Sequence, residues 1–253
     1  MSLFNDPNLD QKYTAMKTGG QILARIIYEL KDITEPGMSA SHLDQIAYQK
    51  IIAADSKPAF LGYQGFPNSL IVSLNNEVVH AIPKSHKIIN DGDLVTFDLG
   101  LYYQGFCTDM AISFILGKNH DPVAQNLLAA AETALDNAVN LIEPGIQIGD
   151  LGNIIEKTAK EFKVKVIYDC AGHGVGKKIH EEPTIPNFGR INTGPQLIIG
   201  QTVAIEPIFA VTTNYFSHQP DGWTLVTEDG SLAVQAEHTV IITPKGHEIL
   251  TLR

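Results

Sequence analysis

The sequence has little cysteine and no long apolar run. Its two cysteines, Cys107 and Cys170, stand apart and cannot build a disulfide framework, which favours a reducing compartment. No stretch approaches the about 18 consecutive apolar residues that a membrane-spanning helix needs. The N-terminal segment has neither the basic nor the apolar region of a secretory signal. We therefore expect a cytoplasmic protein that has no membrane partner.

Positive charge is also scarce. The 253 residues include 18 basic and 28 acidic side chains, and the formal net charge is -10. This balance disfavours a nucleic-acid partner, because such partners are bound largely through their phosphates. Glycine and proline occur at ordinary frequency and 44% of the residues are hydrophobic, so the chain can bury a sizeable core.

Hydrophobic periodicity predicts four helices and several short strands. The first helix is expected over 10–30, and the second follows a stop at Pro36-Gly37. Asp121 and Pro122 suit the N-cap and first position of a third helix, and a fourth spans about 151–162. Strands are expected at 70–74, 94–101, 111–116, 202–209 and 238–243. This order is typical of a mixed α+β protein.

Two sequence patterns recur at one common spacing. Glu35-Pro36-Gly37 returns as Glu143-Pro144-Gly145, and the run that ends at Asp98 returns as the run that ends at Glu206. One match can arise by chance, but two matches at the same spacing indicate duplicated halves. Because no linker rich in Gly, Ser or Pro separates them, we expect one domain over 1–253 with halves at about 12–117 and 121–250.

Two aspartates fall close together in the first half. Asp98 closes an apolar run and Asp109 follows a turn at Gly105, a spacing that suits a hairpin with both carboxylates on one face. Taken alone, the pair is explained equally well by one exposed aspartate and one turn aspartate.

Two glutamates favour a shared site. Glu206 holds the position equivalent to Asp98, and Glu237 precedes another β run. If the halves face each other, four carboxylates share one cavity, where their mutual repulsion requires neutralising cations such as two divalent ions. Carboxylates with one imidazole and no cysteine favour Mn, Fe, Co or Zn ions over a structural zinc cluster.

Three histidines stand in candidate site motifs. His173 lies in the motif GHGVG, whose glycines permit close approach of a ligand, so it is the favoured imidazole. A phosphate-binding loop is the alternative, but the motif lacks GxGxxG spacing and the P-loop lysine. His180 opens the motif HEEP, and His80 ends the run Glu77-Val78-Val79-His80. Each histidine by itself is more often structural than catalytic.

Together, these motifs resemble the methionine aminopeptidases of the bacterial type I class, over about residues 12–250. The resemblance rests on the segment 75–83, Asp98, Asp109, the motifs at 172–176 and 180–183, Ile205-Glu206-Pro207, Asp221-Gly222-Trp223 and the segment 235–239. It implies the pita-bread fold, an α+β architecture with two pseudo-symmetric halves around a central antiparallel sheet and a dinuclear metal site. It also implies an enzyme that removes methionine from nascent proteins and peptides with a small second residue, with the ribosome as a further candidate partner.

The resemblance assigns a role to each candidate ligand. It implies that Asp98 chelates the first metal and that Asp109 and Glu237 bridge both metals. His173 and Glu206 then complete the shell of the second metal. The two divalent ions, which are Co, Mn, Fe or Zn, would share a hydroxide that attacks the peptide carbonyl.

Three residues are expected to act on the substrate during hydrolysis. By the same resemblance, His180 donates a hydrogen bond to the developing oxyanion. His80 contacts the scissile nitrogen or the following residue, and Glu206 carries a proton to the leaving amine.

The methionine pocket is where this sequence departs from the family it resembles. Relatives usually have cysteine at the positions of Phe60 and Ile71, tyrosine at Phe66 and phenylalanine at Ile179. These departures predict a changed pocket size, although apolar residues are also explained as ordinary core. The expected substrate-binding residues are His80, His180, Phe60, Tyr63, Phe66, Ile71, Ile179 and Trp223.

Two alternatives share the fold. An Xaa-Pro aminopeptidase or creatinase-like hydrolase usually has an additional N-terminal domain, for which the segment before Asp98 is short. A non-catalytic binding protein typically lacks several metal residues, whereas all five are present here. Since two halves complete the site by themselves, we expect a monomer.

Overall fold

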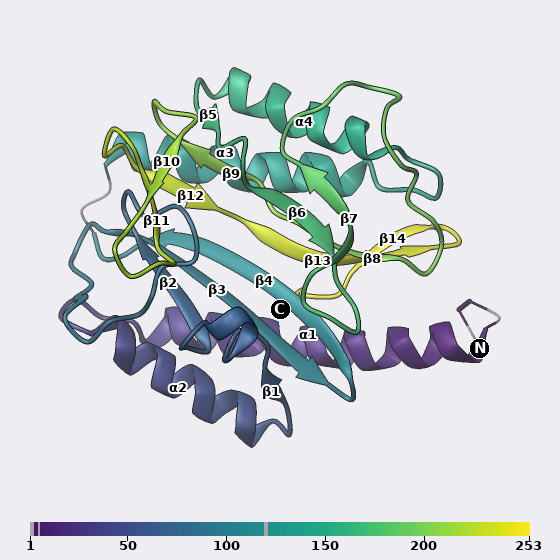
Figure 1. The fold of residues 1–253 in the computed structure, drawn as a ribbon, viewed down its shortest axis with the longest axis horizontal. Helices are drawn as coiled ribbons and strands as arrows, with labels where there is room; N and C mark the ends of the chain where they lie inside the picture. The colour runs from purple at the N-terminus through teal and green to yellow at the C-terminus, as the bar shows by residue number, and fades with distance from the viewer. Residues whose placement is uncertain (1–2, 5, 119–120) are drawn as a thin grey trace.

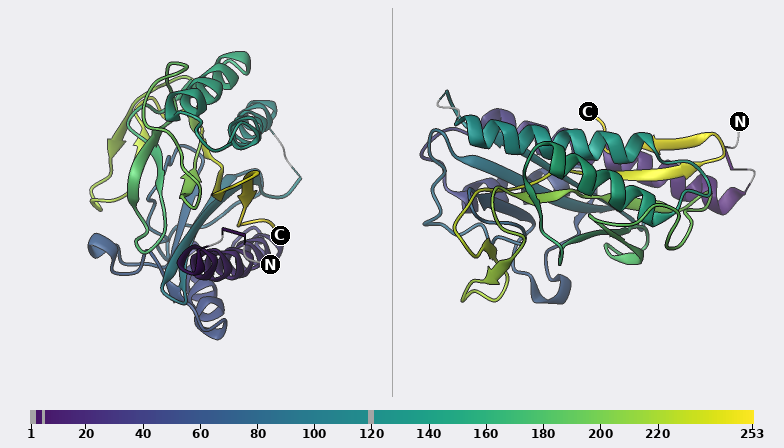
Figure 2. Two further views of the ribbon diagram at one scale, coloured as in Figure 1. Left: turned by 90° about the vertical axis from the view of Figure 1, so that its right-hand side faces the viewer. Right: turned by 90° about the horizontal axis from the view of Figure 1, so that it is seen from above.

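Four helices flank a curled antiparallel sheet in the computed structural model, which describes residues 3–4, 6–118 and 121–253 (Figures 1 and 2). The helices are α1 (Pro7–Ile33), α2 (Ala40–Ala53), α3 (Pro122–Asn140) and α4 (Ile148–Glu161), and a short 3-10 helix, η1, covers Tyr63–Gly65. None of these helices is long and apolar enough to cross a membrane.

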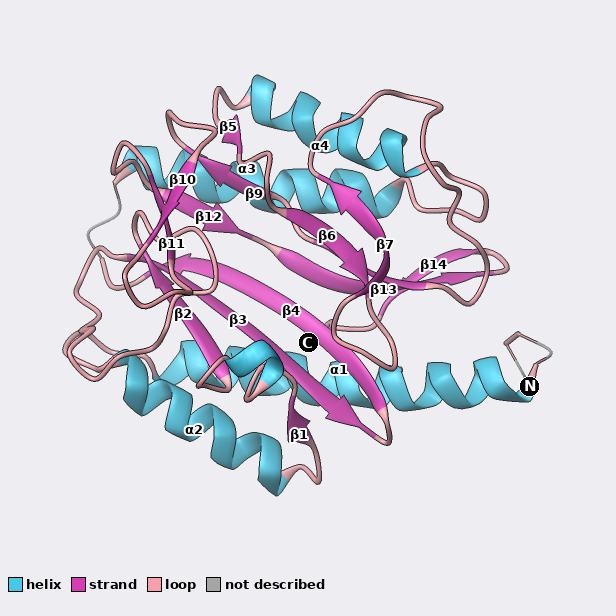
Figure 3. Ribbon diagram, in the orientation of Figure 1, coloured by secondary structure: helices cyan, strands magenta, loops and turns pink. Residues whose placement is uncertain are grey.

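The main sheet has nine strands in the order β1-β3-β4-β13-β8-β6-β7, with β2 paired to β3 and β14 paired to β13. Its members are β1 (Lys57–Pro58), β2 (Leu70–Leu74), β3 (Leu94–Tyr103), β4 (Phe106–Ile115), β6 (Ala171–Gly174), β7 (Glu181–Pro186), β8 (Thr202–Ile205), β13 (Glu237–Thr243) and β14 (Gly246–Ile249). Two small sheets join β10 (Phe216–His218) to β11 (Leu225–Thr227), and β12 (Ala233–Gln235) to β9 (Ile208–Ala210) and β5 (Lys165–Val166). The predicted α+β composition is confirmed (Figure 3).

Local signals set the helix starts. The Asp121 carboxylate accepts a hydrogen bond from the Val123 amide at 2.9 Å, and Pro122 is the first residue of α3, as the sequence predicts. Helix α1 begins earlier than predicted, at Pro7, because Asp6 caps it by accepting from the Asn8 amide at 2.9 Å. Apolar periodicity predicted this helix but not its cap.

The predicted hairpin between the two aspartates is formed by β3 and β4. Its turn residues, Gln104 and Gly105, have φ values of 48° and 83°, as a two-residue type I′ turn requires. Asp98 lies opposite Ala111, and Asp109 lies opposite Gly100. Directly opposed residues point to the same face, and so do residues two apart on one strand. Both carboxylates therefore project from the same face of the hairpin.

The run expected as one strand over 202–209 is divided in two. Strand β8 ends at Ile205 and β9 begins at Ile208, and they belong to different sheets. Pro207 stands in the gap, and its nitrogen has no hydrogen to donate to a strand ladder. The expectation of a continuous strand is wrong for this reason, and Glu206 lies at the break.

Strands from the two expected halves of the chain meet within the main sheet. Strand β13 pairs with β4 through Glu237 opposite Ala111 and His238 opposite Met110, and it also pairs with β8. Helices α1 and α2 pack against β2, β3 and β4 in one apolar cluster. Helices α3 and α4 form another cluster with β8 and β13. Asp109 and Glu237 consequently lie where these two packed regions join.

Candidate metal centre and substrate cavity

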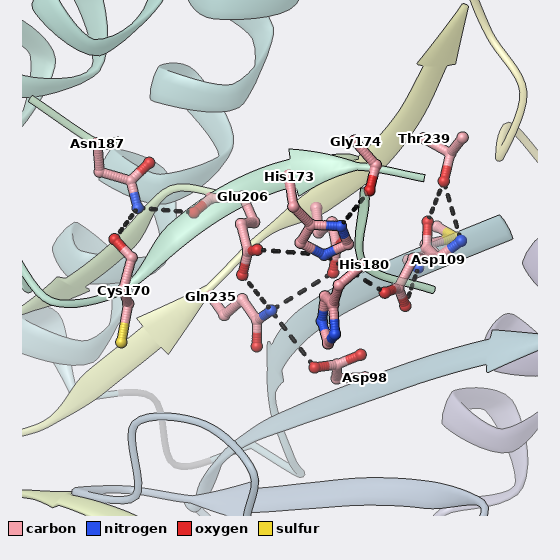
Figure 4. A network of polar contacts seen from close by, with 12 residues as sticks. Asp98, Asp109, Cys170, His173, Gly174, His180, Asn187, Glu206, Gln235 and Thr239 are labelled. Atoms are coloured by element: carbon pink, nitrogen blue, oxygen red, sulfur yellow. Dashed lines mark hydrogen bonds and ion pairs between the residues drawn. The ribbon is translucent and has the colours of Figure 1, made fainter. Parts of the chain in front are cut away.

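Five polar side chains from distant parts of the sequence gather in one site, and Figure 4 shows four of them, Asp98, Asp109, His173 and Glu206, pointing toward one another. Asp98 comes from β3, Asp109 from β4 and His173 from β6, while Glu206 follows β8 and Glu237 begins β13. The four acidic residues are only 2% to 9% exposed. The antiparallel pairing of the five strands brings these residues together from distant parts of the sequence.

His173 lies among these carboxylates. Its Nε2 atom is 3.6 Å from Glu206 Oε1 and 3.8 Å from Asp109 Oδ2. Its Nδ1 atom is 2.9 Å from the Gly174 carbonyl oxygen, which fixes the orientation of the ring. Ligand atoms of Asp109, His173 and Glu237 all lie within 4.8 Å of one another. These three side chains can therefore reach one ion.

Burial makes this group of carboxylates costly in their charged form. It raises the pKa of Asp98 to about 7 and raises the pKa values of Asp109, Glu206 and Glu237 well above their ordinary range. Repulsion between the neighbouring carboxylates raises the last three values further. Burial also lowers the pKa of His173 to about 4, so its ring is neutral near pH 7 and free to act as a ligand.

Gln235 lies at the centre of the group, although the sequence analysis assigned it no role. Its Nε2 atom is 3.3 Å from Glu206 Oε2 and 3.4 Å from oxygens of both Asp98 and Glu237. A signal was present, because Gln235 precedes Glu237 by two residues and side chains two apart share one face of a strand.

A cavity of about 810 Å³ opens beside the carboxylates. One wall is apolar and aromatic: the Phe66 ring meets that of Trp223 edge-on at 5.1 Å and that of Phe60 at 6.5 Å. On another side, His180 Nδ1 is 2.9 Å from the Tyr63 hydroxyl. The predicted residues that line the cavity are Phe60, Tyr63, Phe66, Ile71, His80, Asp98, Asp109, His173, His180, Glu206, Trp223 and Glu237.

Ile179 differs from the other predicted pocket residues. It is fully buried, belongs to the same apolar cluster as Phe60 and is outside the cavity lining. A β-carbon added at Gly100 would approach both the Ile179 and Phe60 side chains to 3.2 Å. Ile179 therefore supports the wall by packing within the core.

Comparison with known proteins identifies the family. Residues 14–244 match metallopeptidase family M24. The chain belongs to this family. Among M24 relatives, the methionine aminopeptidase of Aquifex aeolicus is 42% identical over 246 residues, which cover 93% of this chain and 94% of the relative. Methionine aminopeptidase 1 of Bacillus subtilis is 37% identical over 236 residues, 93% of this chain and 94% of its own.

Solved structures of M24 proteins share the fold. The crystal structure of methionine aminopeptidase from Thermotoga maritima has a TM-score of 0.94 and 37% sequence identity, and the match covers 100% of both chains. Prolidase from Pyrococcus furiosus has a TM-score of 0.77 at 21% identity, covering 100% of this chain and 66% of its own. The second match concerns the fold alone. The expected pita-bread fold is confirmed.

Family membership and the cluster of Asp109, His173 and Glu237 indicate divalent metal ions in this M24 protein. The surrounding chemistry fits them. Asp98 Oδ1 and Glu237 Oε1 are buried and have no hydrogen-bond partner among the described residues. A buried carboxylate oxygen without a donor is costly, and a cation satisfies it. The donor set contains oxygens and one imidazole nitrogen, which suits several first-row metals.

Proposed function

We propose that this M24 protein is an aminopeptidase that removes the N-terminal methionine from polypeptides with a small second residue. One observation carries the proposal: a buried group of metal-type ligands adjoins an aromatic wall in a single cavity. The relatives that match nearly the full length of the chain are methionine aminopeptidases. An Xaa-Pro hydrolase is not favoured, because its likeness is at the level of the fold.

The proposed ligands for two divalent ions are Asp98, Asp109, His173, Glu206 and Glu237. When bound, such ions supply Lewis-acid chemistry, since they polarise a carbonyl and lower the pKa of water. The ligand set accepts Co, Mn, Fe or Zn, and availability in the cell decides among them.

His180 is proposed to donate a hydrogen bond to the oxygen of the scissile carbonyl. The Tyr63 hydroxyl accepts a hydrogen bond from Gln64 Nε2 at 3.1 Å and lies 2.9 Å from His180 Nδ1. If the hydroxyl donates its own hydrogen to Nδ1, the neutral imidazole carries its proton on Nε2. Tyr63 would thus keep His180 in the tautomer that can donate into the cavity.

His80 and Glu206 are proposed to act on the nitrogen side of the scissile bond. His80 lines the cavity and has a φ of 57°, in the left-handed region that non-glycine residues rarely adopt. This conformation supports a contact between His80 and the scissile nitrogen or the following residue. Glu206 also lines the cavity beside the metal ligands, a position that supports its proposed role of passing a proton to the leaving amine.

The aromatic wall is proposed to bind the methionine side chain. The rings of Phe60, Phe66 and Trp223 offer edges and faces to a thioether sulfur, and Tyr63 and Ile71 complete the pocket. The wall is built from bulky residues, which favours an unbranched side chain over a branched one.

Nascent polypeptides in the cytoplasm are the proposed substrates, and the ribosome is a proposed partner. The protein is proposed to act as a monomer, because the five proposed ligands line one cavity within a single chain.

Peptide hydrolysis by metal-stripped protein tests the function. Met-Ala-Ser, Met-Val-Ser and Ala-Pro-Ser are incubated with the protein, with and without Mn²⁺, Co²⁺ or Fe²⁺. We expect metal-restored release of methionine from Met-Ala-Ser and no cleavage of Ala-Pro-Ser. Cleavage of Ala-Pro-Ser alone would instead assign the protein to the proline-specific branch, and no cleavage with any metal would favour a binding protein.

A further inference from the structure

Trp223 contributes to the cavity wall from a short loop, residues 221–224. Trp223 stands just before β11, after a turn at Asp221 and Gly222, and its ring packs edge-on against Phe66 at 5.1 Å. Gly222 has a φ of 80°, a conformation that suits glycine. The position of the Trp223 ring therefore depends on what holds this loop.

Asp221 ties the loop together from within. Its Oδ1 atom accepts hydrogen bonds from the Trp223 amide at 3.1 Å and the Thr224 amide at 2.9 Å. Its Oδ2 atom accepts from the Thr224 hydroxyl at 2.8 Å and from Lys84 Nζ at 2.6 Å. The Asp221 side chain is only 10% exposed, whereas that of Lys84 is 38% exposed. Lys84 thus supplies an ionic bond to the loop from a distant part of the chain.

Backbone contacts connect the same loop to the segment that contains His80. The Val78 amide donates to the Leu225 carbonyl at 2.8 Å, and the Leu225 amide donates to the Val79 carbonyl at 3.2 Å. On the other side of His80, the Ile82 amide donates to the Thr224 hydroxyl at 3.2 Å. The Lys84–Asp221 pair extends this series of contacts, so the two segments are joined both before and after His80.

We infer that Lys84 and Asp221 are positioning residues that hold Trp223 in the cavity wall, and thereby set how tightly the first residue of the substrate is bound. The inference rests on the proposed function for its substrate. A wall that is ordered beforehand need not be ordered when the peptide binds, so more of the contact energy appears as affinity.

The electrostatics of Asp221 support this assignment. Burial raises the pKa of its carboxyl group, but the hydrogen bonds from Lys84, Thr224 and Trp223 outweigh that effect and hold the pKa well below its ordinary value. The folded protein therefore stabilises the charged form that accepts these bonds.

Tryptophan fluorescence tests the positional part directly, because Trp223 is the only tryptophan in the sequence. The metal-loaded wild-type protein is compared with Lys84→Met, which keeps the apolar stem but removes the ammonium group, and with Lys84→Arg. Lys50→Met is the matched control, since Lys50 forms a 2.6 Å ion pair with Glu29. We expect Lys84→Met and Asp221→Asn to shift the emission and increase acrylamide quenching, while Lys84→Arg and Lys50→Met resemble the wild type.

Steady-state kinetics with Met-Ala-Ser tests the functional part. We expect Lys84→Met to raise KM by about three- to tenfold, with kcat within about twofold of the wild type and recovery in Lys84→Arg. Unchanged fluorescence in Lys84→Met, or an unchanged KM, would overturn the inference. A fall in kcat without a change in KM would also do so, because it would place Lys84 in the chemistry and not in binding.

The fluorescence and kinetic experiments together distinguish a failure of this inference from a failure of the proposed function. If the wild-type protein cleaves no methionine peptide, the proposed function fails. The fluorescence comparison alone then decides whether Lys84 and Asp221 position Trp223. If the wild type cleaves the peptide but Lys84→Met matches it in fluorescence and KM, the positioning role of Lys84 and Asp221 is wrong, whereas the proposed function is supported.

Discussion

Buried charge distinguishes the residues of the candidate metal centre from the rest of the acidic side chains. Glu237 is 2% exposed and Asp109 is 3% exposed, although carboxylates are seldom buried without a partner. Exposed acidic residues such as Glu228 keep their carboxylates in water and therefore avoid this desolvation cost. The consequences of substitution should therefore differ sharply between these two classes of acidic residue.

Replacing Glu237 with alanine should release metal. We expect Glu237→Ala to weaken metal binding by about a hundredfold or more, because it removes an anion within reach of Asp109 and His173. Metal per chain is measured by mass spectrometry after dialysis, with Glu228→Ala as the exposed control. Full retention of metal in Glu237→Ala would rule out Glu237 as a metal ligand.

Replacing His180 with alanine should separate turnover from metal binding. We expect His180→Ala to keep its metal and to lose about 10²- to 10³-fold in kcat, the usual cost of removing one oxyanion donor. Tyr63→Phe should show a smaller loss, because the imidazole remains but the 2.9 Å contact to Nδ1 is absent. An unchanged kcat in His180→Ala would contradict the assignment.

The β3–β4 hairpin brings Asp98 and Asp109 to one face, and it depends on the backbone conformation of its two turn residues. Both central turn residues have positive φ values, but only Gly105 adopts this conformation without strain; Gln104 does not. Strand β4 also pairs with β13, so the hairpin links the first strands to the centre of the sheet.

Substitutions in this turn should change stability in opposite directions. We expect Gly105→Ala to lower the free energy of unfolding by about 1 kcal/mol, because alanine is strained at a φ of 83°. Gln104→Asn should raise it slightly, since asparagine tolerates the left-handed region. Urea unfolding monitored by circular dichroism measures both variants. Equal stability of the two variants would show that the turn is not strained as described.

On the scale of the whole molecule, the sheet is continuous across the proposed halves at 12–117 and 121–250. Strand β13 pairs with β4 on one side and β8 on the other, and the carboxylates lie along this junction. We propose that the chain unfolds as a single domain, and that bound metal stabilises it by neutralising charge at the junction.

Metal removal should lower the melting temperature, while thermal unfolding should remain a single cooperative transition. At a free metal concentration about 100 times Kd, one ion stabilises the folded state by about 2.7 kcal/mol. For a chain of this size we expect Tm to rise by about 5–10 °C on adding Mn²⁺ to stripped protein. Differential scanning calorimetry should show one transition in both states. Two separate transitions would contradict the single-domain proposal.

Much of the candidate site was predictable, because its chemistry depends on residue type and spacing. The turn at Gly105 placed Asp98 and Asp109 on one face, and the recurring pattern related Glu206 to Asp98. The break between β8 and β9 was missed, since apolar periodicity outweighed the effect of Pro207 in the prediction. Gln235 was missed because an amide next to a carboxylate motif is chemically unremarkable until its neighbours in space are known.

The sequence alone determined the α+β composition, the cap of α3, the hairpin turn and the family resemblance, because these follow from local conformational preferences and from residue order. Only the tertiary structure decided which side chains share a surface. It put Ile179 in the core and not in the cavity lining, and it brought Lys84 to Asp221. Such contacts depend on the pairing and packing of distant elements, which local preferences do not specify.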